Sequence, residues 1–148
     1  MKKISVILII GLVLVACGEQ TESLKPLDKG MPNTVALPNG EVVYKMDGEW
    51  NATIDYPTFG TINKDILKIT QDGNKFVGSF LNGNELQDAG IEVIKGELEK
   101  NGFKSLYVNS VEGWLPATTK IDGNCNKIAT RIHIKRKELT LKMDLTRK

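Results

Sequence analysis

The chain has 148 residues and a formal net charge of +2, from 20 basic and 18 acidic side chains. This length favours a single domain with a modest hydrophobic core. Two cysteines and a single histidine exclude a credible zinc or copper site built from the usual sulfur and nitrogen ligands.

Residues 1–16 have the layout of a secretory signal. Two lysines follow Met1, and an apolar run extends from Ile4 to Val15, which is the order of regions in such a signal. The run is shorter than the roughly 20 apolar residues that a membrane-spanning helix needs. The sequence therefore predicts export and removal of this segment.

The quartet Leu14-Val15-Ala16-Cys17 resembles the bacterial lipobox, in which small residues precede a cysteine that receives a diacylglyceryl group. The resemblance implies cleavage after Ala16 and a lipid anchor on Cys17, including palmitate-type chains. A plain signal with a chance cysteine is the alternative, and it predicts a soluble protein. Acyl chains contribute about 0.8 kcal/mol per buried CH₂, so two or three of them anchor a protein stably. In Gram-negative lipoproteins, Gly18 at this position favours the outer membrane.

Residues 17–45 are predicted to be the lipidated N-terminus and a flexible linker. The segment from Gly18 to about Gly40 is polar, contains Pro26, Pro32 and Pro38, and lacks sustained periodicity. Such composition is typical of an extended tether. The folded domain is then expected at residues 46–148.

From Met46 onward, short segments alternate apolar and polar residues with a period of two, which indicates half-buried strands. Eight strands are predicted, at about 47–56, 64–72, 74–82, 91–100, 103–111, 113–121, 127–137 and 138–147. Asp72-Gly73, Asn101-Gly102 and Asp122-Gly123 predict tight hairpins, because these dipeptides tolerate positive φ. Regular short strands favour a barrel or a sandwich. Consecutive hairpins favour an all-β, eight-stranded, antiparallel up-and-down barrel. The interior of such a barrel is either filled by side chains or holds one small ligand.

Gly48-Glu49-Trp50 opens the first of these strands, and Arg147 lies near the end of the last. Here the chain resembles the lipocalin and fatty-acid-binding (calycin-type) superfamily, whose first strand begins with Gly-x-Trp. The resemblance implies that Trp50 packs under Arg147 by a cation–π contact and closes one end of the barrel. Avidin-like barrels and barrel-shaped inhibitors of bacterial envelopes share this outline, so the fold does not select a function.

Aromatic residues are few, and most are expected to pack in the core. A functional interpretation places Tyr107 and Trp114 in a ligand pocket, where rings supply apolar area and polar atoms orient the ligand. The segments 57–63 and 82–90 are predicted to be loops at one mouth of the barrel.

No catalytic constellation is recognisable. His133 falls on the polar face of its strand, Glu97 and Glu99 lie beside a predicted hairpin, and no serine lies in a Gly-x-Ser-x-Gly elbow. We therefore expect no enzymatic activity, no cofactor and no metal.

The C-terminal part is basic: residues 125–148 hold eight lysines and arginines against two acids. Such asymmetry can mark an anionic partner, but a solvated face with a basic tip at 135–137 is the simpler interpretation. Export argues against nucleic acid. With Cys17 lipidated, Cys125 has no partner for a disulfide within the chain and is expected in a polar turn.

Two functions are compatible with these features. The first, which the resemblance favours because Gly-x-Trp barrels of known role are more often carriers, is a membrane-tethered carrier that binds a small apolar or amphiphilic molecule inside the barrel. The second is a non-enzymatic interaction protein, of the inhibitor or exclusion type, that binds an envelope protein through its loops. A barrel interior filled by side chains would remove the first.

Overall fold

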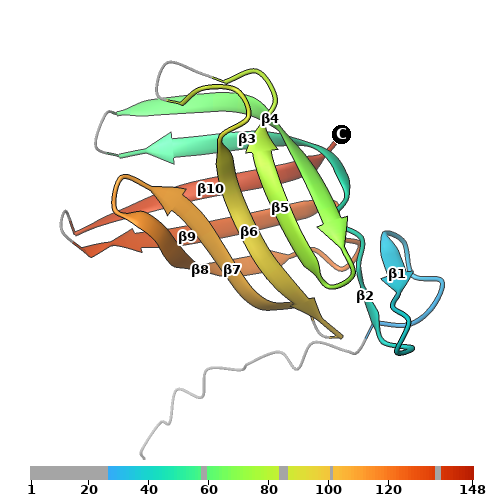
Figure 1. Cartoon of the computed structure of the whole chain (residues 1–148). Coiled ribbons are helices and arrows are strands. Elements are labelled where there is room, and N and C mark those ends of the chain that lie inside the picture. Colours follow the sequence, from blue (N-terminus) through green and yellow to red (C-terminus); the bar gives the residue numbers. More distant parts are fainter. Residues whose placement is uncertain (1–26, 58–59, 84–86, 101, 136–137) are drawn as a thin grey trace, which may run out of the picture.

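The alternating segments after Met46 form eight antiparallel strands that close into one up-and-down barrel (Figure 1). This computed structural model describes residues 27–148 except 58–59, 84–86, 101 and 136–137. The barrel strands are β3 (Gly48–Tyr56), β4 (Thr61–Asp72), β5 (Lys75–Phe80), β6 (Glu92–Glu99), β7 (Gly102–Ser110), β8 (Gly113–Ile121), β9 (Lys127–Ile134) and β10 (Leu139–Arg147). Each pairs with the next along the chain, and β10 closes the ring against β3. The predicted fold class is confirmed.

Strand alternation places one apolar row inside the barrel. On β9, Ile128, Ile132 and Ile134 are buried, whereas His133, between two of them, is exposed. The same alternation runs along β10. Since successive side chains on a strand point to opposite faces, the sequence pattern decides which face of the sheet lies inside.

Strands β4 and β5 differ in length, and this difference shapes one rim of the barrel. β4 begins at Thr61, earlier than the predicted residue 64, and has 12 residues, whereas β5 has six. β5 pairs only with the Leu67–Asp72 part of β4. The first half of β4 is therefore paired with β3 alone among the described strands.

A second, two-stranded sheet covers one end of the barrel (Figure 1). It consists of β1 (Thr34–Ala36) and β2 (Val42–Tyr44), and all three residues of β2 are buried. The chain reaches it from Leu27, whose N–H donates to the carbonyl of Lys100 at 3.0 Å. The composition predicts a flexible linker up to residue 45, but in the structure β1 and β2 pair as a hairpin, and Leu27 and the whole of β2 are buried.

The two ends of the barrel are thus different. At the end that we call the closed end lie the β1–β2 hairpin, the β4–β5, β6–β7 and β8–β9 connections, and the C-terminus. At the opposite end, the loop end, lie the connections at 57–60, 81–91, 111–112 and 135–138. Across the described part of the chain, no helix combines the length and apolar character needed to cross a membrane.

Candidate functional site

Trp50 lies fully buried at the closed end, with none of its surface exposed. Its indole N–H donates to the carbonyl of Met46 at 2.8 Å. The guanidinium carbon of Arg147 lies 4.3 Å from the centroid of the indole ring. Gly48, with φ of +126°, begins the strand directly beneath this arginine. The residues named by the Gly-x-Trp resemblance are therefore brought together in one structural cluster.

Arg147 also ties the last strand to two other chain segments through their carbonyl groups. Its guanidinium donates to Lys45, to Asp47 at 3.3 Å and to Cys125 at 3.4 Å. A planar guanidinium suits this task because its five donors have fixed directions. Carbonyl oxygens and an aromatic face surround it, which suits a structural role.

Cys125 is buried beside this cluster and not in a solvated turn. Its side chain has no exposed surface, and its Sγ lies 3.9 Å from the Sδ of Met46. Burial raises the pKa of the Cys125 thiol to about 11, although Arg147 opposes the rise. A protonated thiol is a poor nucleophile, so this cysteine is inert at neutral pH.

The turn that carries Cys125 is longer than the predicted two-residue hairpin at Asp122-Gly123. Asp122 accepts from the backbone N–H groups of Asn126 at 2.7 Å and Lys127 at 3.0 Å. Positive φ falls on Cys125, at 51°. An Asp side chain that closes a turn in this way is an Asx-type motif, which competes with the tight hairpin.

The barrel interior is closely packed around two of its glycines, Gly96 and Gly78. Gly96 faces inward, and a methyl group there would lie 2.4 Å from the carbonyl oxygen of Ser105 and 2.8 Å from Phe76. At Gly78 it would lie 2.6 Å from Ile94. The large interior side chains have at most 2% of their surface exposed: Trp50, Ile54, Leu67, Ile69, Phe76, Phe80, Ile94, Leu98, Ile128, Ile132 and Met143. A cavity would leave part of such side chains uncovered, so these residues form a solid core.

One polar group within this core lacks a partner. Thr130 has no exposed surface, and its hydroxyl has no hydrogen bond. It faces inward between Ile128 and Ile132, opposite Met143 of β10. A buried hydroxyl without a partner costs about 1–3 kcal/mol.

Tyr107 and Trp114, proposed from the sequence as pocket residues, lie on the outer face of the barrel. Leu106 and Val108 on either side of Tyr107 are buried, and Tyr107 is 38% exposed. The ammonium of Lys95 lies 4.1 Å from the centroid of the Trp114 ring. These two aromatic residues therefore do not line the interior.

Four of the seven large apolar side chains that are exposed in the described residues lie at the loop end. Val111 is 81% exposed, Ile62 is 64% exposed, and Leu81 and Ile91 are each 41% exposed. All four lie in or directly beside the connections at this end. Exposed aliphatic groups of this kind mark contact surfaces when they lie together.

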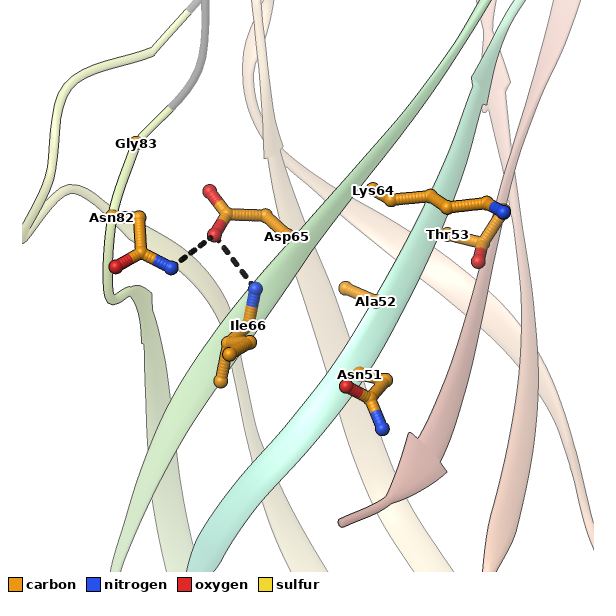
Figure 2. A pocket seen from close by; sticks show the side chains of 8 residues that line it. All are labelled: Asn51, Ala52, Thr53, Lys64, Asp65, Ile66, Asn82 and Gly83. Atoms are coloured by element: carbon orange, nitrogen blue, oxygen red, sulfur yellow. Dashed lines mark hydrogen bonds between the residues drawn. The ribbon is translucent and has the colours of Figure 1, made fainter.

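An open groove of about 530 Å³ lies where the loop after β5 leaves the sheet (Figure 2). The carboxylate of Asp65 reaches across to Asn82, with one oxygen 3.5 Å from the amide nitrogen and 2.6 Å from the N–H of Ile66. The other oxygen, Oδ2, is buried without a hydrogen-bond partner. Lys64 extends on the other side of the groove, toward Thr53 (Figure 2). The groove is open to solvent and is lined by both polar and apolar groups.

The remaining candidate groups are on the surface. His133 is exposed, and Glu97 accepts from Lys104 at 3.1 Å and Asn74 at 3.0 Å. The hydrogen bond from Lys104 lowers the pKa of Glu97. Of the basic tip, Lys135 is exposed, and residues 136–137 lie outside the described residues. In the part of the chain that the structure covers, no three metal-binding side chains meet.

The closed eight-stranded up-and-down barrel is consistent with a calycin-like fold, which in general suits ligand binding. Comparisons with protein-family models, curated proteins and solved structures give no match for the chain.

Proposed function

We propose that the protein is a lipid-anchored, non-enzymatic interaction protein of the bacterial envelope, whose solid barrel presents its loop end to a protein partner. The observation that carries this proposal is the contrast between a filled interior and an exposed apolar rim. Side chains occupy the space around Gly78 and Gly96, whereas Val111 and Ile62 are largely exposed. The apolar surface that can contribute to binding then lies on the outside of the barrel and not within it.

The place where the N-terminal segment reaches the barrel supports the orientation in which the loop end faces the partner. The lipobox-like quartet places the proposed lipid on Cys17, ten residues before Leu27. Leu27 packs at the closed end, next to Lys100. A membrane anchor on Cys17 would leave the closed end nearer the membrane and direct the loop end toward the partner.

The lipid anchor is tested by the mass and the membrane association of the protein. We expect wild-type protein to fractionate with membranes and to carry a diacylglyceryl group on Cys17. The Cys17→Ser variant should lose both properties. Recovery of wild-type protein in the soluble fraction, without a lipid mass, would refute the anchor.

The loop-end surface is tested by cross-linking in cells. Val111→Asp together with Ile91→Asp places charge on the exposed rim, and we expect it to reduce partner cross-links at least tenfold. Val35→Asp is the matched control, because Val35 is 38% exposed at the closed end. Equal cross-linking by both variants would contradict the proposal.

A second candidate is a carrier of one small apolar molecule, which the general use of such barrels suggests. The specific observation in its favour is the inward-facing Thr130 hydroxyl without a partner. A ligand that accepts a hydrogen bond from this hydroxyl would have to displace core side chains. Native mass spectrometry after gentle extraction distinguishes the two functions, since only the carrier predicts a bound small molecule.

A further inference from the structure

An open groove of about 250 Å³ crosses the outer face of β5, β6 and β7. Two rows of side chains line it. Cross-strand pairing makes one row of Val77, Lys95 and Tyr107, and the other of Lys75, Glu97 and Ser105. Between the rows, Phe76 is buried in the core and Gly96 has no side chain, so the backbone forms the floor. Neighbouring strands lie about 4.8 Å apart, so a groove that spans three strands is about 10 Å long.

The two walls of this groove differ in polarity. One wall contains Val77 and the ring of Tyr107, which is 38% exposed. The other wall contains the hydroxyl of Ser105 and the carboxylate of Glu97, which accepts a hydrogen bond from Lys104 at 3.1 Å. A bound molecule would therefore meet an apolar surface on one side and hydrogen-bonding groups on the other.

Trp114 and Pro116 extend the apolar wall onto β8. Pro116 pairs with Tyr107. Trp114 lies two residues earlier on the same strand, so it shares the outer face and is a diagonal neighbour of Tyr107. The ammonium of Lys95 lies 4.1 Å from the centroid of the Trp114 ring, a distance at which the ring attracts the cation. The two aromatic residues that the sequence suggested for ligand contact thus lie beside this outer groove.

The groove carries more positive than negative charge. Lys75 and Lys95 line it, and Glu97 is the acidic residue among its lining side chains. Glu97 already forms an ion pair with Lys104. Lys75 is exposed and has no ion pair among the described residues. A carboxylate on a bound molecule would complement this positive charge.

We propose that this groove binds a linear glycan that carries carboxylate groups. A pyranose ring has C–H groups on its faces and hydroxyl groups around its edge, which matches one aromatic wall and one polar wall. Tyr107 supplies the flat apolar surface on which such a face can stack. The sugar hydroxyls then face Ser105 and Glu97, and the carboxylate faces Lys75. A length of about 10 Å accommodates two linked sugar rings.

The walls favour a glycan over a proline-rich peptide. Such peptides dock in grooves lined by aromatic residues, whereas the wall of Lys75, Glu97 and Ser105 has no aromatic side chain. None of the lining residues belongs to the connections at the loop end. The inference therefore goes beyond the proposed function and does not depend on it.

The test is binding of the full-length protein, in mild detergent, to an array of linear glycans. The probes are fragments of alginate, pectin, hyaluronan, chitin and cellulose, from two to six sugar units long. Each acidic fragment is also present in its carboxyl-reduced, neutral form. We expect the protein to retain an acidic fragment and to bind its neutral form at least fivefold more weakly.

Variants test whether the retained fragment lies in the groove. Tyr107→Ala removes the stacking surface and should weaken binding at least tenfold, whereas Tyr107→Phe keeps the ring and should stay within threefold of wild type. Lys75→Glu should weaken binding of the acidic fragment at least tenfold. Lys142→Glu makes the same charge change at an exposed position of β10 and should bind like wild type. Unchanged melting temperatures would show that every variant is folded.

A second measurement observes the contact itself. In proton NMR spectra, C–H protons on one face of the bound sugar should shift upfield, because they lie over the ring of Tyr107. The shift should persist with Tyr107→Phe and disappear with Tyr107→Ala.

The inference is overturned if the array retains no acidic glycan, if Tyr107→Ala binds as tightly as wild type, or if the neutral forms bind as tightly as the acidic ones. Binding of a proline-rich peptide at Tyr107 in place of a glycan would also overturn it. If Val111→Asp with Ile91→Asp removes partner cross-links while no glycan is retained by wild type, the proposed function stands and only this inference falls.

Discussion

At the scale of single residues, Arg147 does more than cover the indole of Trp50. Its contacts with the carbonyls of Lys45, Asp47 and Cys125 join the approach to β3, the β8–β9 turn and the last strand. A guanidinium that stacks on an aromatic ring and donates to several carbonyl groups holds these segments in fixed relative positions. The Gly-x-Trp resemblance indicated the contact with Trp50 but not these backbone bonds, since carbonyl positions depend on the fold.

Arg147→Ala is expected to lower the free energy of unfolding by about 2–4 kcal/mol, from lost charged hydrogen bonds and the cation–π contact. Arg147→Lys should lie in between, because an ammonium cannot serve three separated carbonyls at once. Lys148→Ala, which removes only a surface contact with Glu49 at 2.8 Å, is the control and should have no measurable effect. Urea unfolding measures all three. Similar stability of Arg147→Ala and wild type would contradict this role.

Gly96 tests how closely the interior is packed. Gly96→Ala places a methyl group 2.4 Å from the Ser105 carbonyl oxygen and 2.8 Å from Phe76, and overpacking of this kind costs about 1–3 kcal/mol. Gly123→Ala meets nothing within 4 Å and should stay within about 0.5 kcal/mol of wild type. Thermal unfolding of the pair is the measurement. A neutral Gly96→Ala would indicate unfilled space inside the barrel.

Because the Cys125 thiol is buried, we predict that the stability of the fold depends on pH in the alkaline range. Burial raises the pKa of its thiol from 9.0 to about 11, so between these values the unfolded chain loses the proton first. Stability from this group is complete below pH 9 and is lost as the pH rises toward 11, by about 2–3 kcal/mol. The difference between wild type and Cys125→Ala in urea unfolding from pH 8 to 11 isolates the effect. Parallel pH profiles would contradict it.

At the scale of elements, the β1–β2 hairpin is the part that sequence reasoning missed. Three prolines and the polar composition of residues 18–40 indicated a tether, yet Val42-Val43-Tyr44 follows an Asn39-Gly40 turn and is buried. That short apolar run after a turn dipeptide was the available signal. Its burial depends on the barrel end that it covers, which no local pattern contains.

Paired residues of this hairpin supply a matched test. Val43 is fully buried and pairs with Val35, which is 38% exposed. Val43→Thr buries a hydroxyl and should cost about 1–3 kcal/mol, whereas Val35→Thr should change stability by less than about 0.5 kcal/mol. The melting temperatures of the two variants, measured by calorimetry, test this difference in stability. Equal melting temperatures would mean that the hairpin is not part of the folded domain.

Strand boundaries show where local pattern is sufficient. β9 and β10 alternate cleanly and lie close to their predicted ranges of 127–137 and 138–147. Near Tyr107 and Trp114, adjacent apolar residues make the alternation ambiguous. Pairing with neighbouring strands then decides which side chain faces outward.

At the scale of the whole molecule, the barrel separates two surfaces. The closed end receives the N-terminal segment and is sealed by Trp50, Arg147 and the hairpin. The loop end carries exposed apolar side chains. The sequence predicted the closed, eight-stranded barrel, but whether its interior was filled depended on how side chains from different strands meet.

The most direct test of this account is a native mass spectrum of the full-length protein extracted gently from membranes. We predict the mass of the chain with its proposed lipid on Cys17 and no additional molecule, because core side chains occupy the interior. A small apolar molecule bound at one copy per chain would contradict the account and show that the barrel opens to hold a ligand.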